Sequence, residues 1–99
     1  MRYDSIKQAL RSAGTLRCSK AVRCLHALGF IVREGTTPNH KIFTHPQLSA
    51  RTDFIAGSFS CEHGKDGEAK RPYLRNIIRV LSKYEHALKA IEKEGETHV

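Results

Sequence analysis

The spacing of apolar residues changes twice along this chain of 99 residues, and these changes limit the folds open to it. Over residues 15–28 the apolar side chains recur at helical spacing, and Gly29 ends the run. Residues 30–33 are β-branched and aromatic, which is typical of a strand. Helical spacing returns after Pro72, which suits the first turn of a helix, and continues almost to the end of the sequence.

The whole pattern predicts two helices, three strands and one long last helix. In chain order these elements are residues 2–13, 15–28, 30–33, 40–44, 52–60 and 72–94. Gly35, Pro38 and Asn39 give the first strand connection the composition of a turn, and we expect residues 46–51 and 62–70 to be connections as well. Gly57 is expected to mark a bulge or a close backbone approach in the third strand. Short connections favour an antiparallel sheet, so we expect an α+β fold with helices packed on one face of a three-stranded sheet.

The length of the chain indicates a single domain, and its charge indicates the kind of molecule it binds. A chain of 99 residues forms one domain, and its 17 Lys and Arg against 10 Asp and Glu give a net charge of +7. Residues 85–99 carry two Lys and four Glu, so the positive charge is concentrated in residues 1–84. Such a field favours an anionic partner, usually nucleic acid, although an acidic protein or a membrane surface also fits.

The sequence does not predict a membrane-spanning, secreted or disulfide-rich protein. The longest apolar run, residues 27–32, is too short to cross a bilayer, and the start of the sequence lacks the hydrophobic stretch of a signal peptide. Three cysteines cannot all pair internally, so we expect no disulfide framework. We expect Cys18 and Cys24 to be small residues of the core, and the protein to lie in a reducing cytoplasm.

Six histidines are many for a chain of this length. Three lie on predicted helices or in the tail and are expected at the surface or the rim of the core: His26, His86 and His98. His40, His45 and His63 fall in or beside the predicted sheet. His40 opens a strand after a glycine-containing turn, and an imidazole that titrates near neutrality can act as a general acid or base. Because RNA supplies its own nucleophile, the 2′-hydroxyl, one such histidine with cationic support could cleave RNA without a metal; the alternative is an exposed strand histidine with one hydrogen bond.

Two further sequence patterns could form ligand sites. Cys61-Glu62-His63 could offer two zinc ligands from one face of an extended segment, but no Cys-x-x-Cys or His-x-x-x-His pair completes four ligands, so no metal is predicted. Arg71 and Arg75 lie one helical turn apart, as do Arg75 and Arg79. Such basic residues either hold phosphates or form solvated helix faces. The same two interpretations apply to Lys65 and Lys70 and to a second group, Arg17, Lys20 and Arg23.

The motifs of residues 28–36 and 39–46 resemble those of the HicA family of toxins. The family pattern is a helix ending in Leu-Gly-Phe, a strand, a Gly-Ser/Thr pair with a nearby His, and a strand leading to His-Pro. Here these pieces are Leu28-Gly29-Phe30, Gly35-Thr36, His40 and His45-Pro46. Glu62-His63-Gly64-Lys65 and Tyr73-Leu74-Arg75-Asn76-Ile77-Ile78 match the later loop and helix, so the resemblance covers roughly residues 17–81.

The resemblance implies one domain over residues 1–99 with a fold like that of double-stranded-RNA-binding domains. Residues 1–14 would be an added helix, and residues 82–99 an extension. It further implies a metal-independent mRNA-cleaving toxin, without cofactor, that is inhibited by a HicB-like antitoxin. His40 would be catalytic, the active-site turn would hold Gly35 and Thr36, and His63 could support the site. For the RNA contacts we expect Lys41, Lys65, Arg71 and Arg75.

Two other functions fit the same residues. The first is a non-catalytic RNA-binding module of the same fold, which recognises RNA by shape and backbone contacts. The second is a protein-interaction domain whose long last helix is the working surface.

Overall fold

The computed structural model describes residues 2–64 and 66–97. Its elements in chain order are α1 (Arg2–Ser12), β1 (Leu16–Arg17), α2 (Cys18–Ala27), β2 (Ile31–Glu34), β3 (His40–Thr44), α3 (Pro46–Arg51), β4 (Gly57–Ser60), β5 (Glu68–Ala69), α4 (Arg71–Lys83) and α5 (Glu85–Thr97). Strands β2, β3 and β4 form an antiparallel sheet in that order, which confirms the predicted α+β class, and β1 pairs with β5 in a second small sheet. No helix within the described ranges is long and apolar enough to cross a membrane.

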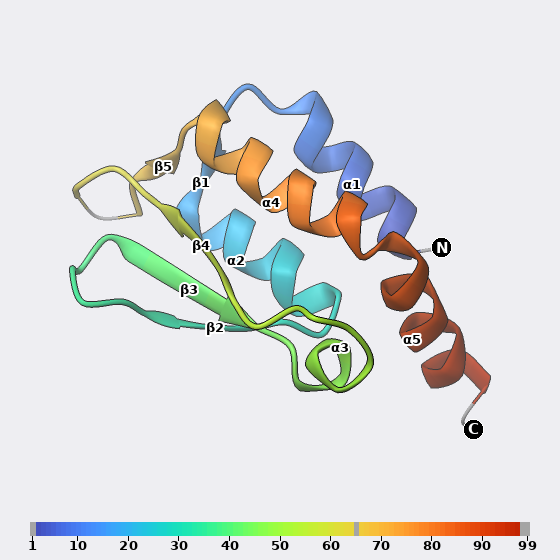
Figure 1. Cartoon of the computed structure of the whole chain (residues 1–99). Helices are drawn as coiled ribbons and strands as arrows, with labels where there is room; N and C mark the ends of the chain where they lie inside the picture. The colour runs from blue at the N-terminus through green and yellow to red at the C-terminus, as the bar shows by residue number, and fades with distance from the viewer. Residues whose placement is uncertain (1, 65, 98–99) are drawn as a thin grey trace.

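The three-stranded sheet has one covered and one open face. Alternation along β3 and β4 turns Phe43 and Phe59 toward the helices, where both are buried. Helix α2 packs near β2 and helix α4 near β4, while α1 packs against α2, α4 and α5 (Figure 1). The opposite face, to which His40 and Ile42 belong, has no helix over it in Figure 1.

Aromatic rings fill the space between the sheet and the helices. Phe43 lies 5.5 Å from Phe30 and 6.2 Å from Phe59, measured between ring centroids. Gly57 sits opposite Phe43 in the sheet, and a Cβ added there would lie 2.3 Å from Cζ of the phenylalanine. The close contact at Gly57 is thus made by an aromatic side chain rather than by another backbone, and this ring explains why the position has no side chain.

Residues 46–51, expected to be a connection, form the short helix α3, and the strand expected over residues 52–60 begins only at Gly57. The helix begins at His45, whose Nδ1 accepts a hydrogen bond from the backbone N–H of Leu48, with Pro46 in the first turn. Nε2 of the same ring donates to the carbonyl oxygen of Leu28 at 3.0 Å. His45 thus caps α3 and links it to the end of α2. The sequence does not predict this cap, because histidine is not among the usual N-capping residues.

His45 should make stability depend on pH in the mildly acidic range. The side chain is 1% exposed, and burial lowers the pKa of its imidazole below the ordinary value near 6.5. The unfolded chain therefore binds a proton at this site more readily than the folded chain does. The free energy of unfolding should be fully retained above pH 6.5 and should fall as the pH drops below it.

Urea unfolding at a series of pH values measures this effect. Hydrogen bonds lower the pKa of four carboxyl groups, those of Glu85, Glu94, Asp53 and Asp66. The stability that these carboxylates contribute is therefore lost only at more acidic pH than the effect of His45. A His45→Gln variant, even if less stable throughout, should lose the slope between pH 6.5 and 5. An unchanged slope in that variant would contradict the assignment.

The long last helix expected over residues 72–94 is instead two helices, α4 and α5, separated at Tyr84. The hydroxyl of Tyr84 donates to Asp53 at 2.7 Å, and its ring lies 5.4 Å from that of Phe54. These contacts hold the residue in a non-helical conformation, and α5 leaves in a new direction (Figure 1). Gly95, expected to end the helix, lies inside α5.

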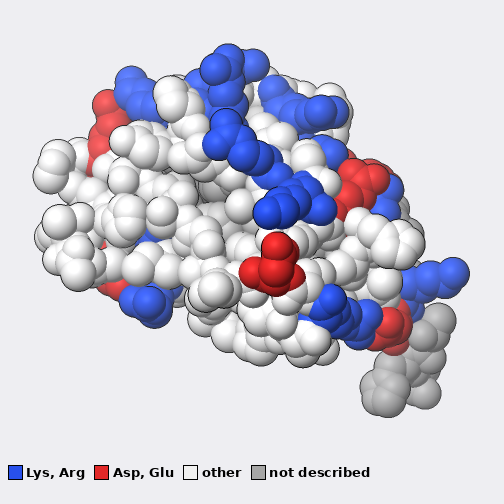
Figure 2. Space-filling model, in the orientation of Figure 1, with Lys and Arg blue, Asp and Glu red and all other residues white. Residues whose placement is uncertain are grey.

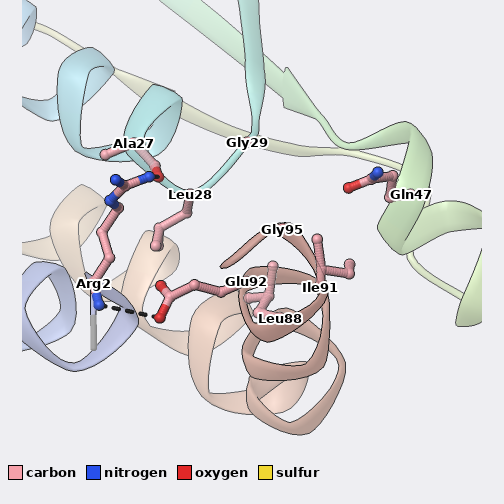
Figure 3. Close-up of a pocket in the computed structure, with 9 residues that line it drawn as sticks. All are labelled: Arg2, Ala27, Leu28, Gly29, Gln47, Leu88, Ile91, Glu92 and Gly95. Carbon is pink, nitrogen blue, oxygen red and sulfur yellow. Dashed lines mark hydrogen bonds between the residues drawn. The ribbon is translucent and has the colours of Figure 1, made fainter. Parts of the chain in front are cut away.

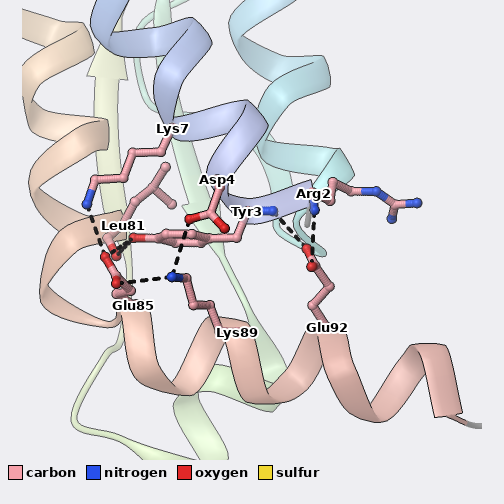
Figure 4. A network of polar contacts seen from close by, with 8 residues as sticks. All are labelled: Arg2, Tyr3, Asp4, Lys7, Leu81, Glu85, Lys89 and Glu92. Atoms are coloured by element: carbon pink, nitrogen blue, oxygen red, sulfur yellow. Dashed lines mark hydrogen bonds and ion pairs between the residues drawn. The ribbon is translucent and has the colours of Figure 1, made fainter.

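The new direction brings α5 against the beginning of α1 (Figure 4). The carboxylate of Glu92 accepts hydrogen bonds from the backbone N–H groups of Arg2 and Tyr3, which are free donors at a helix N-terminus. The buried Tyr3 hydroxyl donates to the carbonyl of Leu81 at 2.6 Å, and Glu85 lies within hydrogen-bond distance of the same hydroxyl and of Lys7. Burial, together with the charge of Glu85, raises the pKa of the Tyr3 phenol, so it stays a donor.

Cys18 and Cys61 form a disulfide with their Cα atoms 5.9 Å apart. The expectation of unpaired core cysteines is wrong for Cys18 and holds for Cys24, which is free and buried. The pairing of β1 with β5 brings the start of α2 beside the segment that follows β4, where the backbone N–H of Cys18 donates to Gly67. Because two of the three cysteines do pair, the number of cysteines does not indicate a reducing compartment.

Candidate functional site

His40 lies at the start of the central strand, on the open face of the sheet. The register places it opposite Ser60 of β4, and its Nδ1 lies 3.3 Å from the Ser60 hydroxyl oxygen. Among the described residues Ser60 is the only hydrogen-bond partner of the ring, so Nε2 has no protein partner there. The side chain is half-buried. The ring is therefore positioned by the sheet while one nitrogen stays available to a ligand.

Gly35 lies on the other side of His40, directly after β2. Its backbone N–H donates to the carbonyl of His40 at 2.7 Å, and the N–H of His40 donates to Thr37 at 3.1 Å, which closes the turn. A Cβ at position 35 would lie 2.6 Å from Cδ2 of the His40 ring. Glycine is thus required for the ring to lie where it does. Thr36, the other predicted turn residue, is exposed in the turn.

Alanine at position 35 should displace the His40 ring. If that ring takes part in catalysis, the rate should fall by about 10- to 100-fold, since a shift near 1 Å can cost that much. The measurements are the rate of RNA cleavage and, to check that the variant is folded, its thermal unfolding. Gly14→Ala is the matched control, because a Cβ there meets nothing within 4 Å. A Gly35→Ala protein with full activity would show that the position of the ring does not matter.

Arg33 is the cation that shares the face of His40. It pairs with Ile42 in the register, and Ile42 is two residues along β3 from His40, so all three side chains belong to the open face. Arg33 is exposed. Sequence reasoning missed this residue because its face depends on the register of the hairpin.

His63 is brought to the same end of the sheet. The side-chain amide of Asn39 donates to Nδ1 of His63, and the carbonyl of Asn39 accepts from the backbone N–H of Cys61. His63 is exposed and lies beside the residue that precedes His40. Asn39 lines the groove on the helical side of the sheet together with Lys41, so His63 lies at the same end of the sheet as His40 but on the side opposite its ring. His45 is enclosed in the core.

The predicted cations are not gathered around His40. Lys41 belongs to the opposite face of the sheet, is 18% exposed in its side chain, and forms an ion pair with Glu34. Arg71 and Arg75 are exposed on α4, in the helical layer. Lys65 lies outside the described residues. Of the predicted RNA contacts, none of those described shares the open face with His40.

A groove of about 530 Å³ lies between α2, the end of the sheet and residues 61–64 and 66–67. Asn39 and Lys41, which flank His40 in sequence, line it together with the disulfide. Arg23 and His26 line the α2 side. The groove is thus adjacent to the end of the sheet that carries His40.

Another hollow, of about 390 Å³, lies between α1, the end of α2 and α5 (Figure 3). Leu28, Leu88 and Ile91 supply its apolar lining. Its charged groups are already paired, since Glu92 accepts from the backbone of α1 and Arg2 donates to the carbonyl of Ala27. This hollow offers no free reactive group and is not a candidate active site.

The zinc alternative and the remaining histidines can also be placed. Cys61 uses its sulfur in the disulfide, so it has no thiolate to offer beside His63. Within residues 2–64 and 66–97 no group of three or more His, Cys, Asp or Glu side chains could hold a metal ion. His26 and His86 are exposed as expected, and His98 lies outside the described residues.

We compared the chain with known protein families, curated proteins and solved structures. No protein-family model, no curated protein and no solved structure matches the chain. The resemblance to the HicA family therefore rests on the sequence motifs alone.

Proposed function

We propose that this protein is a metal-independent endoribonuclease that acts as the toxin of a toxin–antitoxin pair and cleaves mRNA in the cytoplasm. The observation that supports this most is the His40 ring, held between Gly35 and Ser60 on an open sheet face with Nε2 free. A half-exposed imidazole in a fixed position is what general base catalysis requires.

The proposed reaction uses the nucleophile within the RNA. Nε2 of His40 takes the proton from a 2′-hydroxyl, and the 2′-oxygen attacks the adjacent phosphorus. The bond from phosphorus to the 5′-oxygen breaks, and that oxygen takes up a proton from solvent. The products are a 2′,3′-cyclic phosphate and a 5′-hydroxyl, and no electrons or further reactants are needed.

The developing negative charge on the phosphorus oxygens calls for a nearby cation. Arg33 belongs to the same face and is exposed, so it can serve this role better than Arg71 or Arg75 in the helical layer.

An antitoxin that blocks this chemistry would have to cover the open face. Ile31, which is 54% exposed, lies at the far end of that face, two residues from Arg33, and offers an apolar contact to a partner protein. We therefore propose the open sheet face as the surface on which a HicB-like inhibitor would bind.

The test of this function compares two substrates in EDTA. An RNA should be cut to products with 2′,3′-cyclic phosphate ends, while the same sequence made entirely of deoxyribose should stay intact. The measurement is gel analysis of the products together with identification of their ends. Cleavage of both substrates would exclude the 2′-hydroxyl mechanism, and cleavage of neither would exclude the proposed function.

A further inference from the structure

A second concentration of positive charge lies on the helical layer. Arg71, Arg75 and Arg79 recur every four residues along α4 and are all exposed. Since a helix rises 1.5 Å per residue, the three guanidinium groups follow one side of α4 over about 12 Å. Arg11, near the end of α1, faces Arg71 and Arg75 across a hollow of about 210 Å³. We call these four residues the arginine patch.

The charge of the arginine patch is not neutralised by neighbours. Among the described residues none of the four arginines forms an ion pair, whereas Lys7, Lys41 and Arg51 each face a glutamate. Figure 2 shows Lys and Arg gathered over the part of the molecule where α1 and α4 lie in Figure 1. The protein therefore presents an open positive surface away from the sheet.

The arginine patch and His40 lie on different sides of the molecule. The buried residues of α4, such as Leu74 and Ile77, face the interior, while the arginines project from its exposed side. His40 belongs to the face of the sheet that points away from the helices. The sheet and the buried side of α4 lie between the two surfaces, so we expect that an RNA of a few nucleotides bound at His40 does not reach the arginines.

We propose that the arginine patch is a second RNA-backbone contact that makes the protein prefer long RNA to short oligonucleotides. The choice of RNA as the occupant rests on the proposed function. It is supported by the chemistry of the surface, because the planar guanidinium fork matches a phosphate with two hydrogen bonds and is the preferred cation for nucleic-acid backbones. The patch holds the RNA, and the chemistry takes place at His40 on another part of the same strand.

The first experiment measures binding without cleavage. In a His40→Ala background, the affinity for a long RNA is followed over a series of salt concentrations for the variant R75E/R79E. Two lost phosphate contacts should weaken binding at least about tenfold and lower the slope of log affinity against log salt by roughly 1.4. The control K93E/Q47E/S49E makes the same change in net charge at three exposed residues outside the patch. Equal losses in both variants, or no loss in R75E/R79E, would overturn the proposal.

The second experiment separates this proposal from the proposed function. In the otherwise unchanged protein, R75E/R79E should cleave an RNA of a few nucleotides at the normal rate and a long, dilute RNA at least about tenfold more slowly. A similar loss on both substrates would mean that the arginines act at the cleavage site. If the unchanged protein cleaves no RNA, the proposed function fails, while the binding experiment still decides whether the patch holds RNA.

Discussion

Alanine at position 40 is expected to abolish RNA cleavage in EDTA, with a loss of at least about 100-fold in rate. A positioned general base contributes about 10²- to 10⁴-fold, and among the residues that the structure describes no other imidazole belongs to the open face. The measurement is single-turnover cleavage of one labelled RNA by both proteins.

The matched control for this variant is His86→Ala. His86 is exposed on α5, far along the chain from the sheet, and its loss should leave cleavage unchanged. Thermal unfolding of His40→Ala should stay close to that of the parent, because the ring makes only one hydrogen bond to a described residue. Equal cleavage by a folded His40→Ala protein would remove His40 from the mechanism.

Opening the disulfide is expected to cost about 4 kcal/mol of unfolding free energy. The bridge joins residues 43 positions apart, and closing a loop of that length in the unfolded chain removes roughly this much conformational free energy. Urea unfolding with and without a thiol reductant measures the difference. If the protein acts in the cytoplasm as proposed, where thiols are kept reduced, the stability of the reduced form is the relevant one.

The double variant Cys18→Ala/Cys61→Ala controls for other effects of the reductant. It should be less stable than the oxidised parent and should show no response to reductant, since Cys24 is buried and has no partner. A parent protein whose stability does not change on reduction would contradict a stabilising bridge.

Sequence patterns predicted the main elements because these follow from local spacing. The strand His40–Thr44 was predicted with the observed bounds, and the positive φ of Gly29 agrees with its expected role after a helix. Helix α3 was missed because six residues are too few for a helical period to be recognised. The division at Tyr84 was missed because Leu81 and Leu88 keep helical spacing across it, while the cause lies in contacts with Asp53 and Phe54.

The candidate site was predictable only as far as local sequence allowed. The turn carrying Gly35 and the strand beginning at His40 are adjacent in sequence, and the structure brings the two together. Which cations accompany His40 depends on strand register and on which face the helices cover. Arg33 therefore escaped notice, and Arg71 and Arg75 were assigned to a site from which the fold separates them. The Cys18–Cys61 bridge likewise depends on a pairing between β1 and β5 that each strand is too short to signal.

The contact between Glu92 and the first residues of α1 spans 89 positions in the sequence. Loss of α5 would leave the first N–H groups of α1 unpaired, and loss of α1 would leave Glu92 without the N–H groups it accepts from and Glu85 without Tyr3 and Lys7. The two ends of the chain should therefore detach from the rest as one cooperative unit, in a local opening that leaves the sheet and α4 folded.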